Sequence, residues 1–229
     1  MIKLILKKLK AIKTVIKVAS FFAVIIMLIV GVILILTKVG IIDPSEVQAA
    51  SNISSANTTT GDFVQYYQND YSDVSYGSGT IASCGCGPTS FAMVATKLLG
   101  RNITPKDAIE WCGNSYYVSG AGTSWSYFAA AAEHFQLNCT VRETTSIDDV
   151  VSALQKGNLV ISSQGPGLFT NGGHFIVLAS IDNSGGISVK DPNKSNAENK
   201  EHNGDAGYNN TTFTKEEINQ AAKNYWIFE

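Results

Sequence analysis

The chain has 229 residues, four of them cysteine, and a formal net charge of −2 at pH 7. Residues 1–50 hold seven of the 17 basic residues and two of the 19 acidic ones, so residues 51–229 carry ten basic against 17 acidic residues. This longer part has no basic cluster, which argues against nucleic acid as a partner. We find no repeat, dinucleotide-binding motif, phosphate-binding loop or zinc-type spacing, and we expect no cofactor and no metal.

The first 37 residues have the pattern of a membrane-spanning helix. Six lysines precede an uncharged, largely apolar stretch at 18–37. A helix of that length, at about 1.5 Å per residue, crosses the roughly 30 Å hydrocarbon layer of a membrane. Because positive charge favours the cytoplasmic side, we expect residues 1–17 in the cytoplasm and the rest of the chain outside the cell.

The stretch 18–37 fits either a retained signal-anchor or a cleaved signal peptide. Small residues end at Ala49 and Ala50, and cleavage near Ala49 would release a secreted protein. The apolar run exceeds the about 7–15 residues of a usual signal peptide, which favours the signal-anchor. Residues 38–62 are predicted to be a flexible linker, and residues 63–229 one domain with one core.

Helix signals dominate the first half of this domain, and strand signals the second. Ser or Thr caps, Pro at first turns and Gly at ends predict helices over 86–100, 104–113, 122–135, 146–157 and 214–225. Short β-branched or aromatic runs predict strands over 159–163, 174–181, 186–191 and 225–228, with a hairpin turn at 182–186. Helices first and antiparallel strands later predict an α+β domain.

Cys86 is the candidate nucleophile. It opens the predicted helix 86–100, where unpaired backbone N–H groups and the helix dipole favour a thiolate, the reactive form of cysteine. Gly85 and Gly87 leave no side chain beside the sulfur, which would let a substrate backbone approach. The alternative is a buried structural cysteine.

His174 is the candidate general base among the three histidines. It opens the most hydrophobic predicted strand, where an imidazole needs a partner. His134 lies in an alanine-rich helix and His202 in a polar stretch, and neither is expected to act in catalysis. Asp191 ends the neighbouring predicted strand, from which its carboxylate can orient His174; Asn193 is the fallback for that role.

Several segments resemble the papain-like family of bacteriocin-processing, double-glycine-leader cysteine peptidases, and more closely its secreted single-domain relatives. The resemblance covers nearly all of the chain from Tyr66 to Phe228 and includes YYQNDY (66–71), GCGPTSFAMV (85–94), GTSW (122–125), GGHFIVL (172–178), VKDPN (189–193) and YWIF (225–228).

The resemblance implies a papain-like fold in which a helical part carries the cysteine and an antiparallel sheet carries the histidine and aspartate. It also implies that Gln68 contributes to the oxyanion hole together with the Cys86 backbone N–H; Gln65 is the competitor by spacing. Family members that mature bacteriocins are usually cytoplasmic domains joined to an exporter, which this chain lacks, so the chemistry can transfer without the substrate.

The remaining cysteines allow one disulfide. An exported domain permits disulfides, and we expect a Cys112–Cys139 pair. Cys84 lies two residues from Cys86, where a bridge would be strained.

We therefore expect a monomeric, membrane-anchored or secreted cysteine peptidase that hydrolyses peptides or proteins outside the cell. Two alternatives stay open: a peptidoglycan amidase or endopeptidase of the cell wall, and a non-catalytic surface-binding module on the same fold. No recognisable wall-binding repeat separates peptidase from wall hydrolase.

Overall fold

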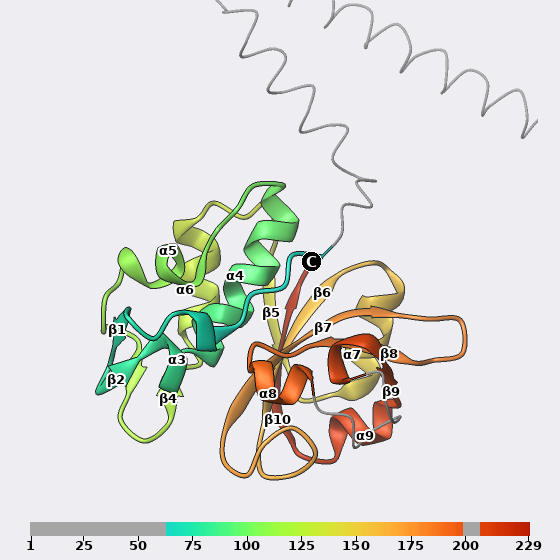
Figure 1. The fold of residues 1–229 in the computed structure, drawn as a ribbon. Helices are drawn as coiled ribbons and strands as arrows, with labels where there is room; N and C mark the ends of the chain where they lie inside the picture. The colour runs from blue at the N-terminus through green and yellow to red at the C-terminus, as the bar shows by residue number, and fades with distance from the viewer. Residues whose placement is uncertain (1–62, 199–206) are drawn as a thin grey trace, which may run out of the picture. The chain divides into compact units, whose positions relative to one another are not determined.

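The computed structural model describes residues 63–198 and 207–229 (Figure 1). Residues 61–229 form one compact unit. The predicted segments 1–17, 18–37 and 38–62 lie outside the described residues. Within the part that is described, no helix combines the length and the apolarity needed to cross a membrane.

The first part of the unit is mainly helical and carries two short hairpins. Its elements in order are η2 (Gln68–Asp70), β1 (Ser75–Tyr76), β2 (Gly79–Thr80), α3 (Ile81–Cys84), α4 (Cys86–Leu99), α5 (Pro105–Glu110), β3 (Tyr117–Val118), β4 (Gly122–Thr123) and α6 (Tyr127–His134).

The second part contains the main sheet. Its elements are β5 (Val141–Thr144), α7 (Ile147–Gln155), β6 (Leu159–Gln164), β7 (His174–Ile181), β8 (Ile187–Lys190), α8 (Lys194–Ala197), η4 (Tyr208–Asn210), β9 (Thr212–Phe213), α9 (Lys215–Asn219) and β10 (Ala222–Phe228). The strand order is β5-β10-β6-β7-β8-β9, and every neighbouring pair is antiparallel. The α+β prediction is confirmed.

Local capping explains where most helices begin. The Thr104 hydroxyl accepts from the Asp107 backbone N–H, and the Asp107 carboxylate accepts from the Thr104 N–H, which is a complete capping box for α5. Thr214 and Glu217 form the same box for α9. Helix α4 ends at Gly100, whose φ of +63° suits glycine.

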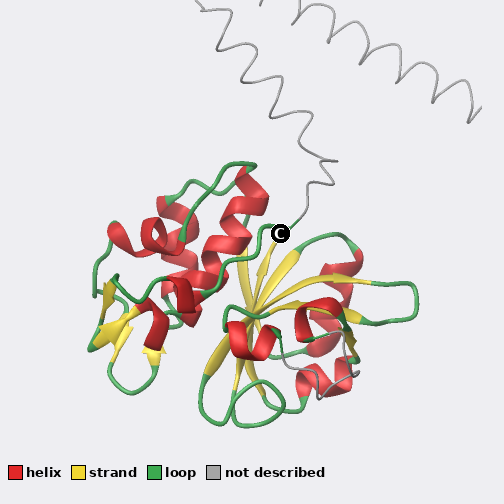
Figure 2. Ribbon diagram, viewed as in Figure 1, coloured by secondary structure: helices red, strands yellow, loops and turns green. Residues whose placement is uncertain are grey.

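The sheet is covered on both faces, so its side chains alternate between two cores. One face packs against α4 and α6 through alternate residues of β6, β7 and β10, among them Ile161, Phe175 and Trp226. The intervening residues, among them Val160, Ile176 and Ile227, pack on the other face in a core shared with α7 and α9. Figure 2 shows the α4 side of the unit as mainly helical and the sheet as a separate layer.

Two of the predicted helices differ most from the observed ones. The helix predicted over 122–135 begins only at Tyr127, because Gly122, at φ +80°, and Thr123 pair with β3 as strand β4. The helix predicted over 214–225 ends at Asn219, because the chain from Ala222 onward joins the sheet between β5 and β6.

The predicted Cys112–Cys139 disulfide is wrong, since both residues are free thiols. The Cys112 sulfur instead lies against the backbone carbonyls of Ile109 and Gly113 in the turn that follows α5. Cys139 packs partly buried against the core beneath α4 and α6.

Phe91 is one of the aromatic side chains that join the helical part to the sheet, and we predict that its loss is costly. It is fully buried, and its ring lies 5.7 Å from Tyr127 and 6.4 Å from Phe228. Phe91→Ala should lower the free energy of unfolding by about 3–5 kcal/mol, measured by urea unfolding of the full-length chain. Leu98→Ala in the same helix is the control: Leu98 is 41% exposed, and a loss of less than about 1 kcal/mol is expected. Equal losses would contradict this account of the core.

Candidate active site

Cys86 is the first residue of α4, as the sequence predicted. Gly85 ends α3 and also precedes α4. A Cβ atom at Gly85 would lie 2.6 Å from the Ile81 carbonyl oxygen, and one at Gly87 would lie 2.7 Å from the Thr123 side chain. The two glycines therefore serve the close packing of α4 against α3 and β4. This packing holds the Cys86 sulfur at the start of the helix, partly exposed.

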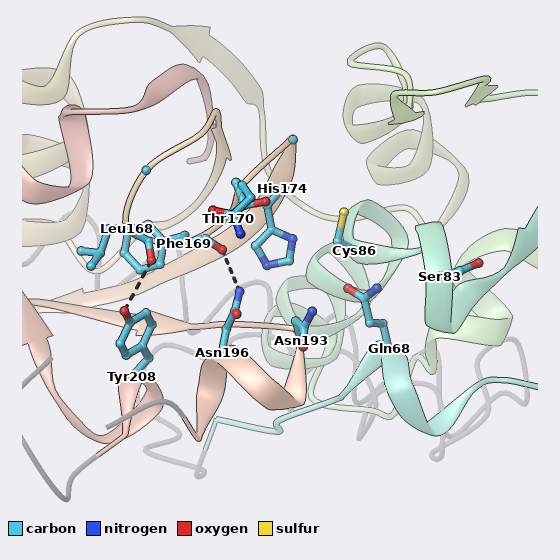
Figure 3. Close-up of a pocket in the computed structure, with 13 residues that line it drawn as sticks. Gln68, Ser83, Cys86, Leu168, Phe169, Thr170, His174, Asn193, Asn196 and Tyr208 are labelled. Atoms are coloured by element: carbon cyan, nitrogen blue, oxygen red, sulfur yellow. Dashed lines mark hydrogen bonds between the residues drawn. The ribbon is translucent and has the colours of Figure 1, made fainter. Parts of the chain in front are cut away.

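His174 and Asp191 form a buried pair beside that sulfur. His174 is the first residue of β7, and Asp191 follows β8, its neighbour in the sheet. The His174 Nε2 atom lies 2.7 Å from the Asp191 Oδ1 atom, and the two side chains are 7% and 0% exposed. Figure 3 shows the His174 ring and the Cys86 sulfur on facing sides of a cavity, one from the sheet and one from α4.

The Asp191 carboxylate is held from several directions. Its Oδ1 atom also accepts the Asn193 backbone N–H at 2.8 Å, and its Oδ2 atom lies 3.3 Å from the Asn196 side-chain nitrogen. These donors compensate for the loss of water around a buried carboxylate. The carboxylate is thereby fixed in the position from which it contacts the imidazole.

The pKa of His174 reflects this environment. Burial lowers it, but the charge of Asp191, the hydrogen bond to Asp191 and the neighbouring Cys86 outweigh burial and raise the pKa from 6.5 to about 10. The imidazole is therefore cationic at neutral pH. An imidazolium beside a helix-terminal cysteine is the arrangement that favours a thiolate.

Gln68 lies on the other side of Cys86 and lines the same cavity (Figure 3). Its side chain is 5% exposed, and its Nε2 atom donates to the Ala82 carbonyl at 2.9 Å. Because a carbonyl can only accept, this bond fixes which end of the amide is the nitrogen. The second Nε2 hydrogen is not used by this bond and can serve an incoming oxygen.

The two fallback residues have other roles. The Gln65 amide donates to the Asp191 backbone carbonyl at 2.9 Å and lines neither cavity beside Cys86. The Asn193 side chain accepts from the Ser195 N–H at the start of α8, so only its backbone reaches Asp191. Both residues hold Asp191 in place through the backbone bonds described, and their side chains do not take the positions of Gln68 or Asp191.

Two cavities border Cys86 and His174. One, of about 530 Å³, has a mainly polar lining that includes Asn193 and Asn196. The other, of about 600 Å³, is lined partly by apolar side chains, including Val118 and Trp125. A polypeptide that crosses the sulfur can thus place residues in both cavities.

With this geometry in place, comparison with known proteins identifies the family. A model of the Peptidase_C39 like family matches residues 60–221. The chain belongs to this family.

The chain is also similar to two solved structures at low sequence identity. A C39-like peptidase structure from Bacillus anthracis is 17% identical, with a TM-score of 0.50, over 73% of this chain and 94% of that one. The peptidase domain of Streptococcus ComA, described as a bifunctional ABC transporter of a quorum-sensing pathway, is 19% identical, with a TM-score of 0.46, over 64% of this chain and 90% of that one. No curated protein matches the chain.

In this member of the Peptidase_C39 like family, sequence reasoning missed two asparagines. Asn196 donates to the Phe169 carbonyl at 2.7 Å as well as approaching Asp191 (Figure 3). The Asn209 side-chain oxygen accepts the Asp191 backbone N–H at 2.8 Å, and its nitrogen donates to Gln65 at 2.8 Å. Both lie in polar stretches without a motif, so no sequence signal marks them.

Among the described residues, the other histidine and cysteine candidates line neither cavity. His134 stacks on Trp111 with ring centroids 4.5 Å apart, and His202 lies outside the described residues. Burial raises the pKa of the Cys112 and Cys139 thiols, which makes them poor nucleophiles. Within 63–198 and 207–229, no group of three or more His, Cys, Asp or Glu side chains could hold a metal ion.

We predict that Asp191, and not the Asn193 side chain, sets the protonation of His174. In ¹⁵N-histidine spectra of the full-length chain, the His174 ring should stay protonated from neutral pH until the pH approaches about 10. Because the folded-state pKa is raised, the stabilisation from this charge is complete below pH 6.5 and is lost as the pH rises toward about 10.

Asp191→Asn removes the largest contribution that raises the pKa and leaves burial, which lowers it. The pKa of His174 should therefore fall by more than about one unit, and each unit corresponds to about 1.4 kcal/mol. Asn193→Ala is the matched control and should leave the titration in place. A shift of similar size in both variants would show that the carboxylate does not hold the proton.

Proposed function

We propose that this chain is a cysteine peptidase that acts outside the cell, anchored by residues 18–37 or released by cleavage near Ala49. The observation that carries the proposal is the buried His174–Asp191 pair facing the helix-terminal Cys86. The lysine-rich start followed by an uncharged stretch supports the location. The family model supports the chemistry.

The proposed reaction begins with attack of the Cys86 thiolate on the carbonyl carbon of a peptide bond. The carbonyl oxygen becomes an oxyanion, which the Cys86 backbone N–H and the free Nε2 hydrogen of Gln68 stabilise. As the C–N bond breaks, the His174 imidazolium donates its proton to the leaving amine. The acyl part of the substrate is then bound to the Cys86 sulfur as a thioester.

Hydrolysis of the thioester restores the site. Neutral His174 accepts a proton from water, and the resulting hydroxide equivalent attacks the thioester carbon. The C–S bond breaks, the thiolate of Cys86 leaves, and the acid product is released. The imidazolium of His174 is regenerated, and Asp191 keeps the ring oriented through both steps.

Two alternatives share this fold. A peptidoglycan amidase or endopeptidase would use the same groups on a cell-wall amide, so its chemistry is identical at Cys86. A surface-binding module would need neither a cationic His174 nor a sulfur beside it. Incubation with casein and with purified wall fragments, followed by mass spectrometry of the products, separates peptidase from wall hydrolase.

We predict that Cys86 is the most reactive of the four cysteines. Iodoacetamide labelling of the full-length chain near pH 7, followed by peptide mapping, should label Cys86 first. His174→Ala should slow this labelling by about tenfold or more, since only a few per cent of an ordinary thiol is ionised at pH 7. Cys112 and Cys139 are internal controls and should react slowly in both proteins. If Cys86 is no faster than these two, the peptidase proposal fails and the binding module is favoured.

We also predict that Gln68 acts on the oxyanion and not on the sulfur. Gln68→Ala should lower kcat about 10²- to 10³-fold, the usual effect of losing one oxyanion donor. Iodoacetamide labelling of Cys86 should be nearly unchanged, because displacement at a saturated carbon forms no oxyanion. Gln155→Ala, an exposed glutamine on α7, is the control. A Gln68 variant that loses labelling and turnover equally would assign Gln68 a structural role instead.

A further inference from the structure

The larger cavity beside Cys86 contains one permanently charged side chain, Lys223. Among the described residues that line the two cavities, no other lysine and no arginine, aspartate or glutamate occurs. Lys223 makes no ion pair with another described residue. Lys223 is also exposed to solvent.

A β-bulge directs Lys223 toward the cavity. Strand β10 pairs Ala222 with Gln164 and Asn224 with Ser163, so Lys223 is an extra residue without a partner on β6. An extra residue of this kind bends the strand and changes where its side chain points. On β6, Gln164 in turn pairs with His174 on β7, so only β6 separates the bulge on β10 from the strand of the proposed base.

Gly165 makes room for this lysine. A Cβ atom at Gly165 would lie 2.6 Å from the Lys223 Cε atom and 3.4 Å from its Nζ atom. Any larger residue at 165 would displace the end of the lysine side chain. The bulge and the glycine together hold a positive charge at the wall of the cavity.

The same cavity presents an apolar surface. Trp125 is 47% exposed and Val118 is 43% exposed, two of the few large apolar side chains left open to solvent among the described residues. Trp125 is held by edge-to-face packing on Trp226, with ring centroids 5.6 Å apart. A fixed, exposed indole can pack against an apolar or aromatic side chain of a ligand.

We infer that the larger cavity, which Lys223 lines, selects peptides in which a carboxylate lies near an apolar side chain. The carboxylate pairs with the Lys223 ammonium, and the apolar side chain packs on Trp125. Residues 51–229 are acidic overall, so an anionic ligand needs this local positive charge to approach the cleft. The inference rests on the proposed function insofar as the bound peptide is the one that Cys86 attacks.

Pools of synthetic octapeptides with a central Phe test this selection. The first pool carries Glu at varied positions and is blocked at both ends, and the second is identical with Gln. The third pool is the Gln pool with a free C-terminal carboxylate. Cleavage in competition by the full-length chain is followed by mass spectrometry. Retention of the same pools on immobilised Cys86→Ala protein gives binding without turnover.

The wild-type chain should prefer the Glu pool over the Gln pool by about 3- to 5-fold, the upper part of the range for one solvent-exposed ion pair. Lys223→Gln should bring this ratio to about 1, and Lys223→Glu should reverse it. Lys156→Gln, an exposed lysine at the end of α7, is the charge-matched control and should keep the ratio. High salt should weaken the preference, because exposed pairs are screened.

The outcomes separate the inference from the proposed function. Preference for the third pool over the Gln pool would support carboxylate binding and would show that the bound carboxylate is the C-terminus of the peptide. Lys223-dependent retention without cleavage would support the inference while contradicting the peptidase. Equal handling of Glu and Gln pools, a preference that survives Lys223→Gln, or no retention of any pool would overturn the inference.

Discussion

The buried contact between His174 and Asp191 is the interaction on which the site depends. Two opposite charges removed from water are costly unless geometry and additional hydrogen bonds compensate. Here the 2.7 Å contact is supplemented by donors from Asn193 and Asn196. Both the pairing of β7 with β8 and the turn after Lys190 must therefore be kept, since a displaced carboxylate would leave a buried charge unpaired.

The turn that holds Asp191 also positions Gln68, the residue proposed to bind the oxyanion. The Gln68 backbone N–H donates to the Pro192 carbonyl at 2.8 Å, and the Asn69 side chain accepts the Lys194 N–H at 2.8 Å. Three residues before Gln68, the Gln65 side chain donates to the Asp191 carbonyl. The segment around Gln68 and the turn after β8 thus form one hydrogen-bonded unit, although more than a hundred residues separate them in the sequence.

Local signals made α4, α5, α7 and the strands from β6 to β8 predictable. The predicted positions of Cys86, His174 and Asp191 at or next to the ends of these elements agree with the structure, and their catalytic roles stay a prediction. The hairpins β1–β2 and β3–β4 are too short for a periodic pattern, and the early end of α9 follows from sheet pairing. Asn196 and Asn209 were missed because their function is defined only by partners that folding brings near. The choice of Gln68 over Gln65 rests on family resemblance and stays a prediction; in the structure Gln65 donates to the Asp191 carbonyl and Gln68 to the Ala82 carbonyl.

Stability alone gives little reason for this site. A buried ion pair can often be replaced by apolar side chains of similar volume without loss of stability, whereas a pair that lacks one partner is strongly destabilising. A fold that only bound a ligand would thus be served as well by an apolar interior at His174 and Asp191. The pair fits the proposed reaction, in which a proton moves at the Cys86 edge of the imidazole. That edge faces two cavities, and Lys223 stands at the wall of only one, so the cleft has the chemical asymmetry that a directional peptide chain requires.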